Sequence, residues 1–336
     1  MTPEIPHMTV PLTSLTNGTE RELPVTPIIS AHVSWIIGYV SYVLSILLGV
    51  VGIFTNTVNI SVYWKMGLSE TTNISFFALS IFDLLISLCT VMVKITFNPP
   101  VSVMRLPSGA PVSELGMGAN FMLYACLTCS AWMTAVLSVE RCICISMPLK
   151  VKEIVTPKRT TFAIVTMVVY QLVFTSFLFL YPGPPYTVVS LRRSLYLNCS
   201  FSFPCLILFF VVLVSTAVLV AKLKENLEWR EKTAKRSNKT PGGSKGMKAA
   251  RSVAAICTIF IICFTPNTLL HVLSLVFNNF GIYDPYLGSL KRNLHRFGGL
   301  LQVLSSAVNI VVYYRISTKY REDCNALFCG QRVEKS

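Results

Sequence analysis

Residues 71–93, TTNISFFALSIFDLLISLCTVMV, carry a single charged side chain, Asp83, in a run long enough to cross a membrane. A bilayer core about 30 Å thick needs roughly 20 apolar residues in a helix. Six further runs of suitable length contain no Asp, Glu, Lys or Arg: 23–64, 115–139, 160–191, 194–221, 252–283 and 297–314. The sequence therefore predicts seven membrane-spanning segments.

The composition is typical of a chain that lies largely in lipid. Of its 336 residues 53% are hydrophobic and 13% charged, and the mean hydropathy is +0.60, whereas soluble domains carry about 25% charged residues. This argues against a solvated globular enzyme and excludes a disordered chain. Backbone groups in lipid are satisfied in helices or closed barrels, and the runs lack the alternation of barrel strands. We therefore predict an all-α membrane protein, a seven-transmembrane helix bundle.

Lys and Arg are unevenly divided between the two sets of connections. The N-terminal tail and the connections on its side carry 8, and the other connections with the C-terminal tail carry 21. Because cytoplasmic loops are richer in Lys and Arg, the N-terminus is predicted outside and the C-terminus inside. Residues 1–32 then form an extracellular tail, 33–315 the membrane domain, and 316–336 a short cytoplasmic amphipathic helix and tail.

The two tails contain candidate modification sites. Asn17 begins an Asn-x-Ser/Thr sequence in the outer tail and is a candidate for glycosylation. Cys324 and Cys329 lie about one short helix beyond the last segment, where S-acylation is expected, with a free thiol as the alternative.

Asp83 lies within a membrane segment, where a charge costs about 2.5–3.5 kcal/mol on insertion scales. Other interactions must offset this cost. Asp83 must face the interior of the bundle, with oxygen partners expected from Ser130 and from Ser305, Ser306 and Asn309. A carboxylate among hydroxyl and amide oxygens suits a small hard cation such as sodium. The alternative is a neutral Asp hydrogen-bonded to its neighbours.

Glu140 and Arg141 end the third segment on the cytoplasmic side. They could form an ordinary interfacial pair, with Arg141 reaching toward the headgroups. However, the following residues stay apolar for two turns before Pro148, which favours an arginine held at the mouth of the bundle. There its fork of donors can reach the backbone carbonyls of a partner.

Two further segments carry features of a movable bundle. Pro266 lies within the sixth segment, where a proline frees a carbonyl and kinks the helix. A kinked helix beside a basic loop can swing its inner end outward. In the seventh segment Asn309 and Tyr313 lie one turn apart on one face.

Together these features resemble a rhodopsin-like (class A) G-protein-coupled receptor from residue 33 to about residue 329. The motifs appear in the family's order: Asn56, Leu79-Ser-Ile-Phe-Asp83, Glu140-Arg141-Cys142 with Pro148-Leu149, Phe260-x-x-Cys-Phe-x-Pro266, and Asn309-Ile-x-x-Tyr313. In detail the chain looks like molluscan chemosensory receptors, which are similar to invertebrate neuropeptide receptors.

The resemblance implies a role for each motif residue. Arg141 would contact a heterotrimeric G protein when the sixth helix opens, with Glu140 restraining it at rest, and Leu149 would fill an apolar pocket on that partner. Phe264 would replace the family's toggle tryptophan, and Tyr313 would hold the open state. The family's sodium site is matched by Asp83, Ser130 and Asn309.

The chain also departs from the family pattern. Near Gly116 the usual cysteine is missing, so Cys199 lacks its expected disulfide partner. Ile310 replaces a proline, and the inner end of the sixth segment carries Lys248 and Arg251 in place of an acid. These departures imply raised basal activity, or restraint by Glu140 alone, and leave open a decayed receptor.

The ligand is expected in the outer third of the bundle, among apolar walls with few polar anchors. The candidates by position are Lys94, Asn120, Leu123, Tyr124, Leu127, Phe264, Asn267 and His271. The outer half of the third segment lacks an acid, which disfavours an amine. A basic outer mouth favours an acidic ligand, although headgroup contacts explain such residues equally well; these are Lys94, Arg192, Arg193, Lys291, Arg292 and Arg296.

The sequence thus predicts a plasma-membrane receptor, not an enzyme, that binds an extracellular small molecule or short peptide and activates a G protein by outward movement of the sixth helix. The alternative is a seven-span ligand-gated channel or transporter. Against it stand the lack of an inverted repeat and of a filter-like segment. An intramembrane enzyme is disfavoured because the chain has four histidines and neither His-Glu-x-x-His nor Gly-x-Ser-x-Gly.

Overall fold

The computed structural model describes residues 26–147, 150–179, 197–237, 245–277 and 284–329, which are almost entirely helical. The long helices are α1 (Ala31–Met66), α2 (Thr71–Thr96), α4 (Val112–Ser146), α6 (Pro157–Phe179), α8 (Phe203–Ser237), α9 (Lys245–Val276) and α10 (Gly288–Ile316). The short ones are α3 (Pro99–Ser102), α5 (Val151–Ile154), the π-helix η1 (Leu197–Ser202) and α11 (Thr318–Cys329).

The long helices correspond to the seven predicted segments. Within the described residues six of them, α1, α2, α4, α8, α9 and α10, are long and apolar enough to cross a membrane. The seventh, α6, has 23 residues, and a helix of that length is about 35 Å long at 1.5 Å per residue. The predicted seven-transmembrane helix bundle is confirmed.

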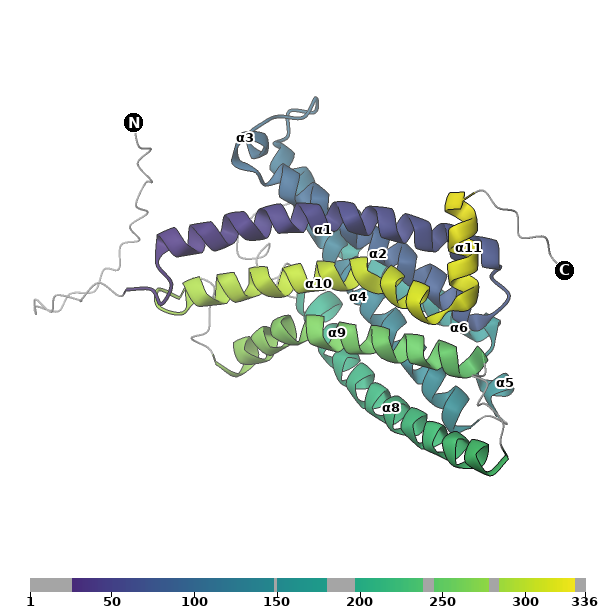
Figure 1. Cartoon of the computed structure of the whole chain (residues 1–336). Helices are drawn as coiled ribbons and strands as arrows, with labels where there is room; N and C mark the ends of the chain where they lie inside the picture. The colour runs from purple at the N-terminus through teal and green to yellow at the C-terminus, as the bar shows by residue number, and fades with distance from the viewer. Residues whose placement is uncertain (1–25, 148–149, 180–196, 238–244, 278–283, 330–336) are drawn as a thin grey trace, which may run out of the picture.

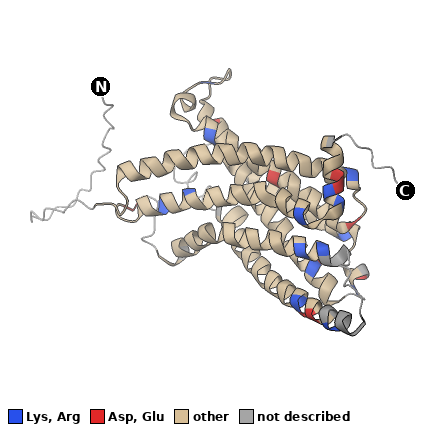
Figure 2. Cartoon of the chain, in the orientation of Figure 1, with Lys and Arg blue, Asp and Glu red and all other residues tan. Residues whose placement is uncertain are grey.

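The helices run side by side, so the bundle has two ends (Figure 1). We call them the α3 end, where α1 begins and α2 joins α4, and the α11 end, where α11 lies across the bundle. Lys and Arg gather mainly at the α11 end, while most of the length of the helices is free of charge (Figure 2). The predicted short helix after the last span is α11.

Two helices begin earlier than their charge-free runs. α10 starts at Gly288, so Lys291 and Arg296 lie on its first turns and not in a connection. α4 starts at Val112, so Glu114 belongs to its first turn, where it is exposed. The charged residues near these ends do not stop a helix, because long side chains extend from it toward water.

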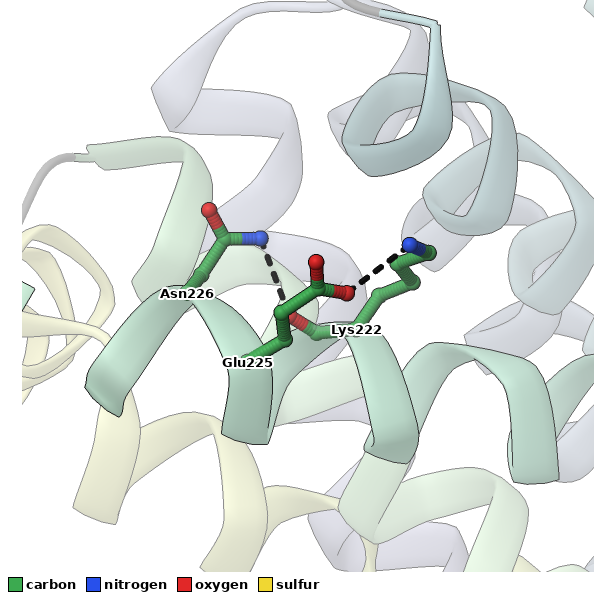
Figure 3. A network of polar contacts seen from close by, with 3 residues as sticks. All are labelled: Lys222, Glu225 and Asn226. Carbon is green, nitrogen blue, oxygen red and sulfur yellow. Dashed lines mark hydrogen bonds and ion pairs between the residues drawn. The ribbon is translucent and has the colours of Figure 1, made fainter. Parts of the chain in front are cut away.

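α8 continues well beyond its charge-free run, which ends at Ala221, as far as Ser237. On this extension Lys222 Nζ pairs with Glu225 Oε2 at 2.8 Å, and Asn226 Nδ2 donates to the Lys222 carbonyl oxygen at 2.9 Å (Figure 3). Both are exposed contacts within one turn of helix, which stabilise an isolated helix by a few tenths of a kcal/mol each, about 0.2–0.5. They extend α8 as a polar helix past the α11 end.

Polar side chains of the spans are buried in the bundle, whereas apolar ones both fill its core and cover its outer face. On α1, Leu47 and Phe54 are 57% and 60% exposed, while Asn56 and Asn59 are fully buried. Asp83 on α2 is 1% exposed. The buried polar groups are therefore the places where the helices recognise one another.

Candidate functional site

Asp83 is the centre of a polar contact that joins three helices. Ser130 Oγ on α4 donates to Asp83 Oδ1 at 2.9 Å. Asn309 Nδ2 on α10 donates to Asp83 Oδ2 at 2.8 Å. The structure thus brings together three residues that the sequence singled out from distant segments.

The surroundings of Asp83 fit a small hard cation. Asn309 Oδ1 is buried and has no hydrogen-bond partner among the described residues. It adds a free amide oxygen to the carboxylate of Asp83 and the hydroxyl of Ser130, which are ligand types that sodium accepts. Ser305 is buried one turn before Asn309 but is not hydrogen-bonded to Asp83 within the described part. The two donated bonds also fit the alternative of an aspartate satisfied by its neighbours.

Glu140 and Arg141 lie near the α11 end of α4, and their side chains contact different neighbours. Thr160 Oγ1 donates to Glu140 Oε1 at 2.6 Å, and Ser75 Oγ donates to Glu140 Oε2 at 3.4 Å. Arg141 Nη2 donates to Thr72 Oγ1 at 2.5 Å. The described residues contain no ion pair between Glu140 and Arg141. The restraint expected from Glu140 is therefore absent as a direct contact in this arrangement.

A cavity of about 260 Å³ opens beside Arg141. It is lined by Tyr63, Met66, Glu70, Thr72, Asn73, Phe76, Arg141, Lys248, Ala249, Ser317, Thr318 and Lys319. Arg141 is 7% exposed, and its Nε has no hydrogen-bond partner among the described residues. A guanidinium with a free donor at a cavity can bind carbonyl oxygens of an entering chain.

Aromatic rings pack where α11 meets the bundle. The Tyr313 ring centroid lies 5.3 Å from that of Tyr63, 4.9 Å from that of Phe76 and 5.4 Å from that of Tyr320. Tyr313 is 1% exposed and Tyr320 is fully buried. The packing places Tyr313, on the last turn of α10, at the junction of α1, α2 and α11.

A polar chain from α11 into α1 was missed by the sequence analysis. The Tyr320 hydroxyl donates to Asn59 Oδ1 at 2.5 Å, and Asn59 Nδ2 donates to Asn56 Oδ1 at 3.1 Å. Asn56 Nδ2 in turn donates to the Ser306 carbonyl oxygen at 3.0 Å. The contact between Asn56 and Asn59 could have been predicted, because the two residues lie one turn apart in a charge-free run.

A second cavity, of about 140 Å³, lies toward the α3 end. Six predicted ligand contacts line it: Lys94, Asn120, Leu123, Tyr124, Leu127 and Asn267. Arg296, predicted as part of the basic outer mouth, also lines it. The sequence analysis missed the other lining residues: Ser45, Thr90, Val93, His295, Gly299, Leu300, Gln302 and Val303. The predicted candidates therefore converge, and α10 contributes more of the wall than expected.

Two predicted ligand contacts do not line this cavity. Phe264 is 4% exposed, and its ring stacks on that of Phe260 with centroids 4.0 Å apart. The His271 ring meets Phe201 edge-on at 5.5 Å. Both residues lie in the packing between helices.

Residues 55–313, more than half of the chain, match the family described as 7 transmembrane receptor (rhodopsin family). The chain belongs to this family. Comparison with curated proteins gives no match. Members of the family are receptors and not enzymes, so Arg141, Asp83 and the two cavities are those of a multi-pass membrane receptor.

The receptor's missing disulfide has a structural counterpart at Gly116. A Cβ at this position would collide with the Thr96 hydroxyl and come within 3.1 Å of the Phe97 ring. Cys199 is a free thiol. Instead of a disulfide, hydrogen bonds hold this part of η1, with Tyr170 donating its hydroxyl to the Cys199 carbonyl oxygen at 2.8 Å.

The remaining predicted positions include the two acylation candidates and residues outside the described part of the structure. Cys324 is 5% exposed, and burial raises the pKa of its thiol; acylation there stays a prediction. Cys329 is the last residue of α11, and its side chain lies outside the described part of the structure. Further predicted positions lie outside the described residues: Asn17, Pro148, Leu149, Arg192 and Arg193.

Proposed function

We propose that the receptor lies in the plasma membrane with its α3 end outside, where it binds a small molecule or short peptide, and that it activates a heterotrimeric G protein at its α11 end. The observation that carries the proposal is the placement of Arg141, which is 7% exposed and lines a cavity with residues of α9. A ligand that prefers the open form shifts the population toward it by its difference in affinity for the two forms.

Arg141 is held by a weak restraint. Within the described part its hydrogen bond goes to the neutral hydroxyl of Thr72. A hydrogen bond to a charged group contributes about 1.5–3 kcal/mol, whereas breaking a buried ion pair costs about 3–5 kcal/mol. Releasing Arg141 therefore costs less than in a bundle locked by a carboxylate, which supports raised basal activity.

The movable element of the proposal is α9. Lys248 and Ala249 of α9 line the cavity beside Arg141, so moving this end of the helix outward enlarges it. Pro266 lies inside α9 and removes one helical hydrogen bond, which makes a bend there cheaper. The segment between Pro266 and Lys248 would then move as one arm.

A sodium ion at Asp83 would modulate this equilibrium. Asp83, Ser130 and the free Asn309 Oδ1 supply its ligands from α2, α4 and α10. An ion held by three helices favours the closed arrangement in which they meet. The same residues are separated if the bundle opens.

The test is G-protein heterotrimer dissociation in transfected cells, comparing the wild type with Arg141→Ala at equal surface level. We expect the response to be lost in the mutant. Arg159→Ala is the matched control, since Arg159 is exposed and donates to backbone oxygens of Glu153 and Ile154 on the same connection. An unchanged response in Arg141→Ala would refute the proposal, and a ligand-evoked current without a G protein would favour a channel.

A further inference from the structure

The cavity toward the α3 end is positively charged without a counter-charge. Lys94 of α2 and Arg296 of α10 line it, together with His295. Its lining contains no Asp or Glu, and among the described residues the ion pairs are Lys65–Asp323 and Lys222–Glu225, which lie elsewhere. A cavity lined by one sign of charge attracts the opposite charge.

The two cations are placed differently, and both can reach a ligand. Arg296 is anchored, since its Nη1 donates to the Ser34 carbonyl oxygen at 3.1 Å and to Asn293 Oδ1 at 2.9 Å. Lys94 has neither a hydrogen bond nor an ion pair to the described residues, and the positive charge of Arg296 repels it. One anion between Lys94 and Arg296 would relieve this repulsion and give the ammonium a partner.

Two oxygens buried in the lining residues also have no partner. They are Thr90 Oγ1 and Asn267 Oδ1, within the described part. The Asn267 amide nitrogen is already used, donating to Gln302 Oε1 at 2.8 Å. Asn267 Oδ1 lies against Gly298, which does not line the cavity. Because buried polar atoms are normally paired, the Thr90 hydroxyl points to a ligand that brings a hydrogen-bond donor.

The volume limits the size of that ligand. The cavity measures about 140 Å³, similar to an engineered cavity of about 150 Å³ that holds benzene. This corresponds to a compact molecule of roughly six to ten non-hydrogen atoms.

We propose that this receptor recognises a small monocarboxylic acid that also carries a hydroxyl or amino group, with its carboxylate between Lys94 and Arg296 and its donor on Thr90. The inference rests on the proposed function and specifies its ligand. It excludes a peptide longer than about two residues from this cavity, because such a peptide exceeds the volume.

A long-chain fatty acid is the competing occupant. A groove of about 670 Å³ beside the cavity shares Lys94 and Arg296 and is lined by aromatic residues of α1 and α2, among them Trp35, Tyr39 and Phe97. Trp35 and Tyr39 are 67% and 58% exposed, which is typical of the aromatic belt that contacts headgroups. Thr90, whose hydroxyl is unpaired, lines the smaller cavity and not the groove, which favours the small acid.

The experiment measures binding and signalling separately on the full-length receptor. Purified receptor in lipid nanodiscs is titrated with short 2-hydroxy and 2-amino acids, their primary amides, the same acids without the donor, and a long-chain fatty acid. The same compounds are tested for heterotrimer dissociation in cells. We expect the hydroxy or amino acids to bind best, with Lys94→Met weakening binding by at least about 30-fold.

Control variants separate this site from general charge effects. Lys94→Arg keeps the cation and should retain most of the binding, and Arg292→Gln removes an exposed charge of α10 that does not line the cavity and should change little. The proposal is overturned if amides bind as well as acids, if the fatty acid alone binds, or if Lys94→Met equals Arg292→Gln. Acids that bind without dissociating a heterotrimer would refute the proposed coupling instead, and a signal from other ligands alone would refute the ligand class.

Discussion

The two ends of the bundle differ in how far their buried polar groups are paired. At the α11 end, Glu140 is held by two hydroxyls and Tyr320 joins a chain of buried asparagines. Toward the α3 end, Lys94 and the oxygens of Thr90 and Asn267 are without partners in the described part. Unpaired buried groups are costly, and the ligand proposed for the α3 end would remove this cost. At the α11 end, Glu140 and Tyr320 are already paired within the chain.

Arg141 and Tyr313 are exceptions at the α11 end, since Arg141 Nε and the Tyr313 hydroxyl are buried without a partner among the described residues. The hydrogen bond of Arg141 is to Thr72. At each end an incompletely paired cation, Arg141 or Lys94, lines a cavity. A ligand at one cavity and a protein at the other would be coupled through the polar contacts of Asp83 between them.

The largest effect on stability is expected at Gly116, where close packing takes the place of the family's disulfide. Gly116→Cys adds a side chain where the Thr96 hydroxyl and the Phe97 ring leave no room. We expect a loss of about 1–3 kcal/mol in stability and a lower surface level, with no disulfide to Cys199. The measurement is surface expression with a thermal unfolding midpoint in detergent.

Gly118→Cys is its matched control, since a Cβ there meets nothing within 4 Å. It should express normally. A stabilised Gly116→Cys receptor with a new disulfide would mean that the α3 end closes as in other family members.

The second effect concerns the link between the two ends. Asp83→Asn keeps the size of the side chain but removes the charge that a sodium ion needs, so the sodium dependence of agonist affinity should disappear. Allosteric couplings of this kind are typically about 1–3 kcal/mol, or 5–150-fold in affinity. The sodium dependence is measured by comparing agonist affinity in sodium and in choline buffer. A wild-type affinity that is the same in both buffers would favour a neutral Asp83.

The third effect tests whether the α11 end is closed by its own contacts. Tyr320→Phe removes the hydroxyl and leaves Asn59 Oδ1 buried without its donor, at a cost of about 1–2 kcal/mol. We expect looser docking of α11, seen as faster amide exchange in this helix. Tyr314→Phe, which loses an exposed bond to Asn325 at 3.0 Å, is the control and should have little effect.

The bundle could be predicted from the sequence because long charge-free runs indicate segments that lie in lipid. It placed the start of α10 too late because Lys291, Arg292 and Arg296 interrupt the run, although such residues are common on helix ends. It also grouped Asp83, Ser130 and Asn309 correctly, since few polar residues in these segments are available to face one another. A membrane span leaves little choice of partners.

The failures concern side chains whose partners are distant in sequence. Glu140 and Arg141 were expected to restrain one another, yet neighbours on a helix do not face each other, and they contact α6 and α2 instead. Tyr320 meets Asn59 across 261 positions of the chain, which no helical periodicity reveals. Such contacts depend on how the helices pack, and the pattern of residues within one segment does not predict that packing.

The smallest effect tests the restraint on Arg141 itself. Thr72→Val removes the hydroxyl that accepts from Arg141 Nη2 and keeps the shape of the side chain. Because this bond contributes in the closed form alone, its loss should raise basal heterotrimer dissociation a few-fold, equivalent to about 1 kcal/mol. Thr71→Val serves as control, since Thr71 lies one residue earlier and has no hydrogen bond to Arg141 among the described residues. If basal activity instead falls, the Thr72 hydroxyl supports the open form, and the restraint at the α11 end must come from Glu140 through its bonds to Thr160 and Ser75.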